Sequence, residues 1–144
     1  MLVQFFVPGR PVPKARARVV LHKGKVRSYT PEATADYEML VRYGAANAMQ
    51  GRRPSDAPVA LRLTVCLPCP TSWSEKRRQE AIEGHFAPTK KPDADNYAKS
   101  ALDALNGIAY RDDAQVVKLS ILKVYSATPG LRFELSELPS RAAP

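Results

Sequence analysis

Residues 91–125 read KPDADNYAKSALDALNGIAYRDDAQVVKLSILKVY, and this stretch predicts a helix followed by a strand. Apolar residues recur at helical spacing from Ala94 to Leu105, and Gly107 is of the type that commonly follows a helix end. The segment from Gln115 to Tyr125 is rich in β-branched residues, which favours a strand. A helix joined to a strand by a short connection is therefore the expected framework of this region.

Four carboxylates lie at the openings of these two elements. Asp93 and Asp95 open the predicted helix, and Asp112 and Asp113 precede the predicted strand. Each acid alone has an ordinary explanation, because Asp is a preferred helix cap and a common turn residue. Closely held carboxylates repel one another unless a cation lies between them, and Mg²⁺ prefers oxygen ligands. Together the acids favour a Mg²⁺ site, although the sequence does not show that the two clusters meet.

The rest of the chain predicts an α+β fold with helices packed on one small sheet, antiparallel or mixed. The element order is roughly β-β-α-β-α-α-β-β, and neighbouring strands at both ends of the chain favour antiparallel pairing. We expect one domain over residues 1–138 and a flexible tail over residues 139–144. Further local signals are a hairpin tip at Lys23-Gly24-Lys25, a helix start at Thr30-Pro31-Glu32, and a capping box from Ser72 to Glu75.

The charge balance indicates a nucleic-acid partner. The 144 residues include 22 Lys and Arg against 14 Asp and Glu, which gives a net charge of +8. A Mg²⁺ site on so basic a chain suggests phosphodiester chemistry on a nucleic acid. No apolar run approaches the ~20 residues that a membrane-spanning helix needs, and the first ten residues do not resemble a signal peptide. We therefore expect a cytoplasmic protein with no membrane partner.

Two groups of cations are candidates for contact with phosphate. Lys14, Arg16 and Arg18 alternate along a predicted strand and so share one face; they could protect a sheet edge, but the net charge favours phosphate contacts. Lys99 follows Asp95 by four residues, on the same helix face. It is either part of a surface ion pair or a cation directed at the transferring phosphate. Nearby Asp103 is interpreted as a solvated helix residue.

The chain has two cysteines, in the sequence Cys66-Leu67-Pro68-Cys69. A zinc site would need two more ligands, and the two histidines stand at unrelated spacings. A redox pair should open a helix, whereas Cys66 ends a strand pattern. We therefore interpret the pair as two reduced thiols near the end of a strand, which disfavours a thiol oxidoreductase.

Five segments of the chain carry its most specific motifs. They are Pro11-Val12-Pro13-Lys14-x-Arg16-x-Arg18, Ser72-Trp73-Ser74, Lys91-Pro92-Asp93-Ala94-Asp95-Asn96-x-x-Lys99, Leu102-Asp103-Ala104-Leu105-Asn106-Gly107 and Tyr110-Arg111-Asp112-Asp113-x-Gln115-Val116. Together these motifs resemble the RusA family of Holliday junction resolvases. The resemblance implies a homodimeric, Mg²⁺-dependent endonuclease that cuts four-way DNA junctions by paired symmetric nicks. It also implies that Asp93, Asp95 and Asp113 bind the metal, with Asp112 as a further candidate, and that Lys99 is a catalytic cation.

The main alternative is a non-catalytic, architectural DNA-binding protein. The basic residues would serve it equally well, but the acid clusters would have no role and would repel phosphate. We therefore favour the enzyme. Under this interpretation the DNA backbone is held by Lys14, Arg16, Arg18, Lys90, Lys91 and Arg111.

Overall fold

The computed structural model describes residues 2–14, 18–29 and 32–139 of the chain. Arg16 of the predicted basic stripe lies outside the described residues. The same holds for the predicted helix start at residues 30 and 31, and for nearly all of the predicted tail.

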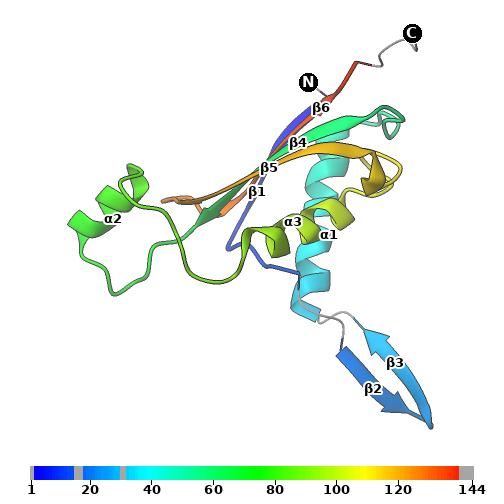
Figure 1. Cartoon of the computed structure of the whole chain (residues 1–144), viewed down its shortest axis with the longest axis horizontal. Coiled ribbons are helices and arrows are strands. Elements are labelled where there is room, and N and C mark those ends of the chain that lie inside the picture. Colours follow the sequence, from blue (N-terminus) through cyan, green and yellow to red (C-terminus); the bar gives the residue numbers. More distant parts are fainter. Residues whose placement is uncertain (1, 15–17, 30–31, 140–144) are drawn as a thin grey trace.

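A mixed four-stranded sheet forms the centre of the described fold, in the order β1-β6-β4-β5 (Figure 1). Strand β6 pairs antiparallel with both β1 and β4, whereas β5 pairs parallel with β4 and leaves its other side as a sheet edge. The prediction of an α+β fold with a small mixed sheet is confirmed. Two details of it are wrong: three strands rather than two precede the first helix, and the last two strands do not pair with each other, because β4 lies between β5 and β6. The strands are β1 (Val3–Pro8), β4 (Val59–Leu67), β5 (Val116–Tyr125) and β6 (Gly130–Glu137).

Two helices cover one face of this sheet, α1 (Glu32–Met49) and α3 (Ala94–Ala104) (Figure 1). Alternation along β4 directs every second side chain into the core, from Val59 to Val65. Both helices contribute apolar stripes at helical spacing to this core, and α3 also packs against α1 and β5. The position of α3 beside β5 brings the acidic segments of the sequence to one side of the molecule.

The connection from α3 to β5 is longer than the sequence suggested, but it is anchored to the end of the helix. The helix ends at Ala104 rather than near Gly107, and the Tyr110 hydroxyl donates a hydrogen bond of 2.6 Å to the carbonyl of Leu102. A 3-10 turn over Asp113–Gln115 then precedes β5, so the strand begins one residue later than predicted. The buried Tyr110 ring and its hydroxyl thereby hold the connection against the end of the helix.

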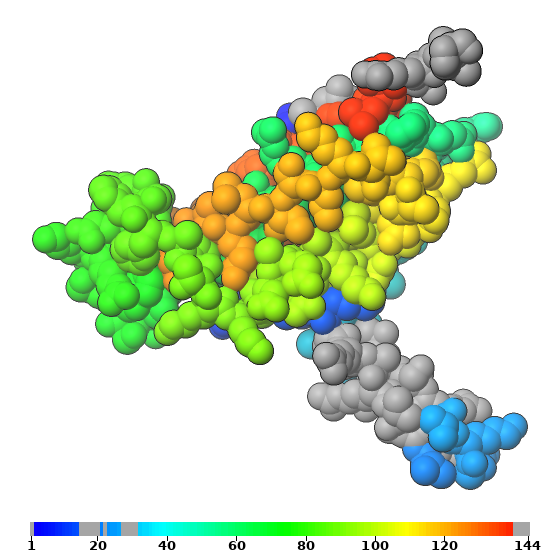
Figure 2. Space-filling view, in the orientation of Figure 1, coloured from blue at the N-terminus to red at the C-terminus, as the bar shows by residue number. Residues whose placement is uncertain are grey.

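A second, two-stranded antiparallel sheet is formed by β2 (Arg18–His22) and β3 (Lys25–Tyr29). The two residues between them, Lys23 and Gly24, have φ angles of 50° and 73°, as type I′ hairpin turns require. The predicted hairpin tip is confirmed. The hairpin extends past the N-terminal end of α1, away from the main body (Figures 1 and 2).

Helix α2 (Glu75–Ile82) lies at the opposite end of the molecule from this hairpin (Figure 1). The predicted capping box at Ser72 is wrong: Ser74 is the N-cap, and its hydroxyl accepts a hydrogen bond of 3.2 Å from the backbone N–H of Arg77. Ser72 instead lies in the turn that the hydrogen bond from Trp73 N–H to the carbonyl of Pro70 closes. None of the described helices is long and apolar enough to cross a membrane.

Candidate active site

The first acid cluster lies at the N-terminus of α3. Asp93 occupies the N-cap position with extended backbone angles, yet its side chain makes no capping hydrogen bond. Asp95 lies in the first turn, and both side chains are exposed. The Asp93 side chain therefore does not cap the helix. Both carboxylates face solvent at the helix N-terminus, where the helix dipole favours negative charge.

The second acid cluster is held by the side-chain amide of Gln115. Its carbonyl oxygen accepts hydrogen bonds from the backbone N–H groups of Arg111 (2.9 Å) and Asp112 (3.0 Å). Its nitrogen donates to the carbonyls of Ser55 (2.7 Å) and Ala57 (3.0 Å), in the loop before β4. One side chain thus joins the acidic turn to the sheet. This role of Gln115 was not predicted from the sequence, although an Asp-x-x-Gln spacing resembles a capping box.

The two acid clusters meet at an open depression of about 410 Å³ between α3 and β5. Asp95 comes from the helix and Asp113 from the turn before the strand, and Lys99 and Asp103 line the same depression. Its apolar lining consists of Ala98, Leu102, Leu119 and Ile121. The structure therefore brings one acid of each cluster to a shared site with Lys99, whereas Asp93 and Asp112 do not line it.

Asp113 shows the electrostatic cost of this arrangement. Partial burial, first, and then the side chain of Asp112 and the negative charge of Asp103 raise the pKa of Asp113 above its ordinary value. A divalent cation at the depression would relieve this repulsion, and carboxylate oxygens are the ligands that hard cations prefer. Within the described part of the chain, however, no three His, Cys, Asp or Glu side chains are grouped closely enough to hold one metal ion. The carboxylates of Asp95 and Asp113 are therefore suitable metal donors, but the described residues do not form a complete set of ligands around one ion.

Asp103 is not the solvated helix residue that the sequence suggested. Its side chain is 33% exposed and lies 3.5 Å from the ammonium nitrogen of Lys14, which is also 2.5 Å from Oε1 of Glu38. Burial lowers the pKa of Lys14, but the hydrogen bond and charge of Glu38 and the charge of Asp103 outweigh it, so the pKa is raised. Lys14 is therefore a charged residue at the rim of the depression, already paired with two carboxylates.

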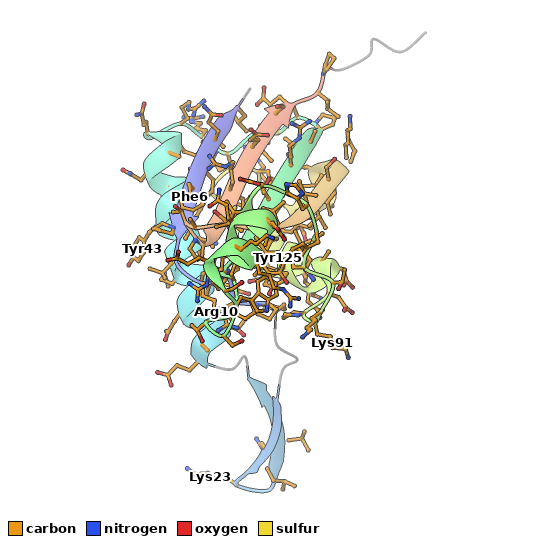
Figure 3. All side chains as sticks on the ribbon, turned by 90° about the vertical axis from the view of Figure 1, so that its left-hand side faces the viewer. Phe6, Arg10, Lys23, Tyr43, Lys91 and Tyr125 are labelled. Carbon is orange, nitrogen blue, oxygen red and sulfur yellow. The ribbon has the colours of Figure 1, made fainter. Side chains whose placement is uncertain are left out.

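Three of the other predicted phosphate contacts, Arg111, Lys90 and Lys91, are exposed on segments next to the acid clusters, whereas Arg18 lies on strand β2 of the hairpin. Arg111 forms an exposed ion pair with Asp56. Lys90 and Lys91 are exposed on the loop before α3, and the Lys91 side chain extends outward (Figure 3). The ammonium of Lys123 donates to the backbone carbonyls of Lys90 (2.9 Å) and Pro92 (2.8 Å) and so fixes this loop to β5.

The two cysteines are free thiols at and just beyond the end of β4. Cys66 is buried, and that burial raises the pKa of its thiol, although Arg132 partly opposes the shift. A thiol with a raised pKa is a poor nucleophile at neutral pH. The burial of Cys66 therefore disfavours a reactive thiol at this position.

Carboxylates and a lysine around one depression, on a strongly basic α+β domain, are characteristic of an enzyme that hydrolyses nucleic-acid backbones. Residues 8–136 match the family described as endodeoxyribonuclease RusA. The chain is also 37% identical over 140 residues to the "Uncharacterized protein YqaN" of Bacillus subtilis (strain 168), with 94% of this chain and 96% of that protein covered. The chain belongs to the RusA family of endodeoxyribonucleases, which confirms the resemblance seen in its motifs and supports nuclease activity on DNA.

Proposed function

We propose that this protein is a Mg²⁺-dependent endonuclease that resolves four-way DNA junctions by paired symmetric nicks, in DNA recombination and repair. The proposal rests on one observation above all, the depression that gathers Asp95, Asp113 and Lys99 in a chain of the RusA family. Neither the family match nor the composition alone would indicate which residues of the chain carry out the chemistry.

Asp95 and Asp113 would hold the metal, with Asp93 as the third ligand and Asp112 as a further candidate. When bound there, the metal lowers the pKa of a coordinated water and stabilises the leaving oxygen. Lys99 lines the same depression as Asp95, and its ammonium would stabilise the negative charge that develops on the phosphate. Gln115 positions the acidic turn, and Lys14 balances the charge of Asp103 at the rim.

The DNA backbone would be held by the cations around the depression. The Arg111 guanidinium pairs with the exposed carboxylate of Asp56, and exposed ion pairs of this kind contribute ~0–1 kcal/mol, so exchange of Asp56 for a phosphate costs little. Lys90 and Lys91 already face solvent beside the α3 N-terminus. Lys14 adds charge at the rim, with Arg16 and Arg18 as further contacts in the same segment.

A homodimer would explain how two opposed strands are cut in one encounter, because two copies of the site are needed. Strand β5 supports this part of the proposal. It is an edge strand of 10 residues, and Val117 and Leu122 on it are 63% and 59% exposed. A long edge with exposed apolar residues is a surface that proteins usually cover. A mass measurement by light scattering at micromolar concentration tests this, and a monomer would contradict it.

A non-catalytic DNA-binding role remains the competing function, and one observation favours it: no three metal-ligating side chains are grouped in the described residues. The two functions separate in one experiment. A labelled four-way junction and a matched linear duplex are incubated with the protein in Mg²⁺ or in EDTA. Symmetric pairs of nicks in the junction, with the duplex spared and no cutting in EDTA, support the resolvase. Binding without cutting supports the architectural protein.

A further inference from the structure

The β2–β3 hairpin has a feature that the proposed active site does not use: apolar side chains at its solvent-exposed tip. Leu21 and Val26 are cross-strand partners, so they lie on one face of the ribbon, and they are 79% and 70% exposed. Lys25 is also exposed and, by strand alternation, lies on the opposite face.

This hairpin receives little support from the rest of the chain. Among the described elements, β2 and β3 make most of their contacts with each other, and the space-filling view shows the residues at the hairpin tip lying away from the main body (Figure 2). An isolated two-stranded ribbon is at best marginally stable in water. Exposed apolar residues on such a ribbon indicate a surface that becomes covered by a partner.

Charge decides what kind of partner fits. Between positions 10 and 31 the chain has no Asp or Glu, and Figure 3 shows one of its cations, Lys23, at the hairpin tip. A second copy of the chain would bring a hairpin of the same charge, whereas DNA offers complementary charge. The basic residues of this segment are Arg10, Lys14, Arg16, Arg18, Lys23, Lys25 and Arg27.

We propose that the hairpin recognises the branch point of a DNA junction, with Leu21 and Val26 packed against unstacked bases and Lys23 and Lys25 on the flanking phosphates. A two-stranded ribbon fits within a DNA groove, and apolar side chains of DNA-bending proteins insert between bases. Bases at a branch point unstack at lower cost than bases within a duplex. The inference rests on the proposed function, because the branch point is the feature that distinguishes that substrate.

The test uses a four-way junction with 2-aminopurine at the branch point, in EDTA so that cleavage does not occur. We expect its fluorescence to rise when the full-length protein binds, because the base loses its stacking partner. Leu21→Ser/Val26→Ser should abolish the rise and leave the salt dependence of binding unchanged. Lys23→Ala/Lys25→Ala should reduce the log–log salt slope by about 1.8, at ~0.9 per phosphate contact. Ile82→Ser on α2, where the side chain is 40% exposed, is the matched control and should change neither.

The inference is overturned if the unmodified protein does not raise the fluorescence, or if Leu21→Ser/Val26→Ser still raises it. A photo-crosslinking amino acid at position 21 gives a second readout: crosslinks to DNA support the inference, and crosslinks to a second protein chain overturn it. Cleavage is measured separately in Mg²⁺. A protein that raises the 2-aminopurine fluorescence without cutting the junction refutes the proposed nuclease and supports the hairpin inference. A protein that cuts the junction without raising the fluorescence supports the nuclease and overturns the hairpin inference.

Discussion

Removal of the Gln115 side chain should separate positioning of the acidic turn from DNA binding. Gln115→Ala deletes four hydrogen bonds, two to the N–H groups of Arg111 and Asp112 and two to the carbonyls of Ser55 and Ala57. A net hydrogen bond contributes ~0.5–1.5 kcal/mol. Because Arg111 and Asp112 are exposed, water can replace the bonds at that end. We therefore expect a loss of about 1–3 kcal/mol in the free energy of unfolding.

The more telling effect should be on cleavage. Without Gln115 the turn that carries Asp113 loses its attachment to the loop before β4, so the rate of junction cleavage should fall at least tenfold while junction affinity stays within twofold. Single-turnover cleavage, gel shifts and urea unfolding measure the three quantities. Gln115→Glu is a second test, since it keeps an acceptor for the two N–H groups but sets a carboxylate oxygen against the carbonyls of Ser55 and Ala57, so it should be no more stable than Gln115→Ala. Unchanged stability and an unchanged cleavage rate in Gln115→Ala would refute the positioning role.

Three further outcomes are expected from the site. Mg²⁺ should raise the melting temperature relative to K⁺ at equal ionic strength, by the equivalent of about 2.7 kcal/mol at 100 times its Kd. Asp95→Asn/Asp113→Asn should abolish this shift, and an equal shift in that variant would show that these carboxylates do not bind the ion. Lys90→Ala/Lys91→Ala should flatten the log–log salt dependence of DNA binding by about 1.8, and an unchanged slope would place both residues outside the interface. Lys14→Ala leaves Glu38 and Asp103 without their shared cation, so the free energy of unfolding should fall by about 1–2 kcal/mol, with partial recovery in Lys14→Arg; equal stability of all three proteins in urea would contradict this.

Local patterns were sufficient to predict most elements of this fold. The apolar stripe of α3, the alternation of β4 and the Lys23-Gly24 turn each depend on neighbours within a few residues. The predicted start of α2 was wrong because two serines, Ser72 and Ser74, can each cap a helix. The choice between them depends on the turn closed by the Trp73 N–H.

The site was predicted less completely because its assembly depends on long-range packing. The residue types at positions 95, 99 and 113 were identified from the sequence, but their meeting requires α3 to pack beside β5 and Tyr110 to hold the connection. The pairing of Lys14 with Asp103 joins segments far apart in the chain and changes a predicted free cation and a predicted solvated acid into partners. No local pattern contains that information.

The most direct measurement is the junction cleavage rate of Asp95→Asn, with binding and melting measured on the same preparation. Asn keeps the size of the side chain, and Asp95 is an exposed residue in the first turn of α3 rather than its N-cap. The substitution removes only a favourable interaction of ~0.3–1 kcal/mol with the helix dipole, so the fold should be retained. Loss of one negative charge from the depression should leave junction binding equal or tighter. The account predicts that cleavage falls by orders of magnitude. An Asp95→Asn protein that folds, binds junctions and cuts them at the unmodified rate would contradict it.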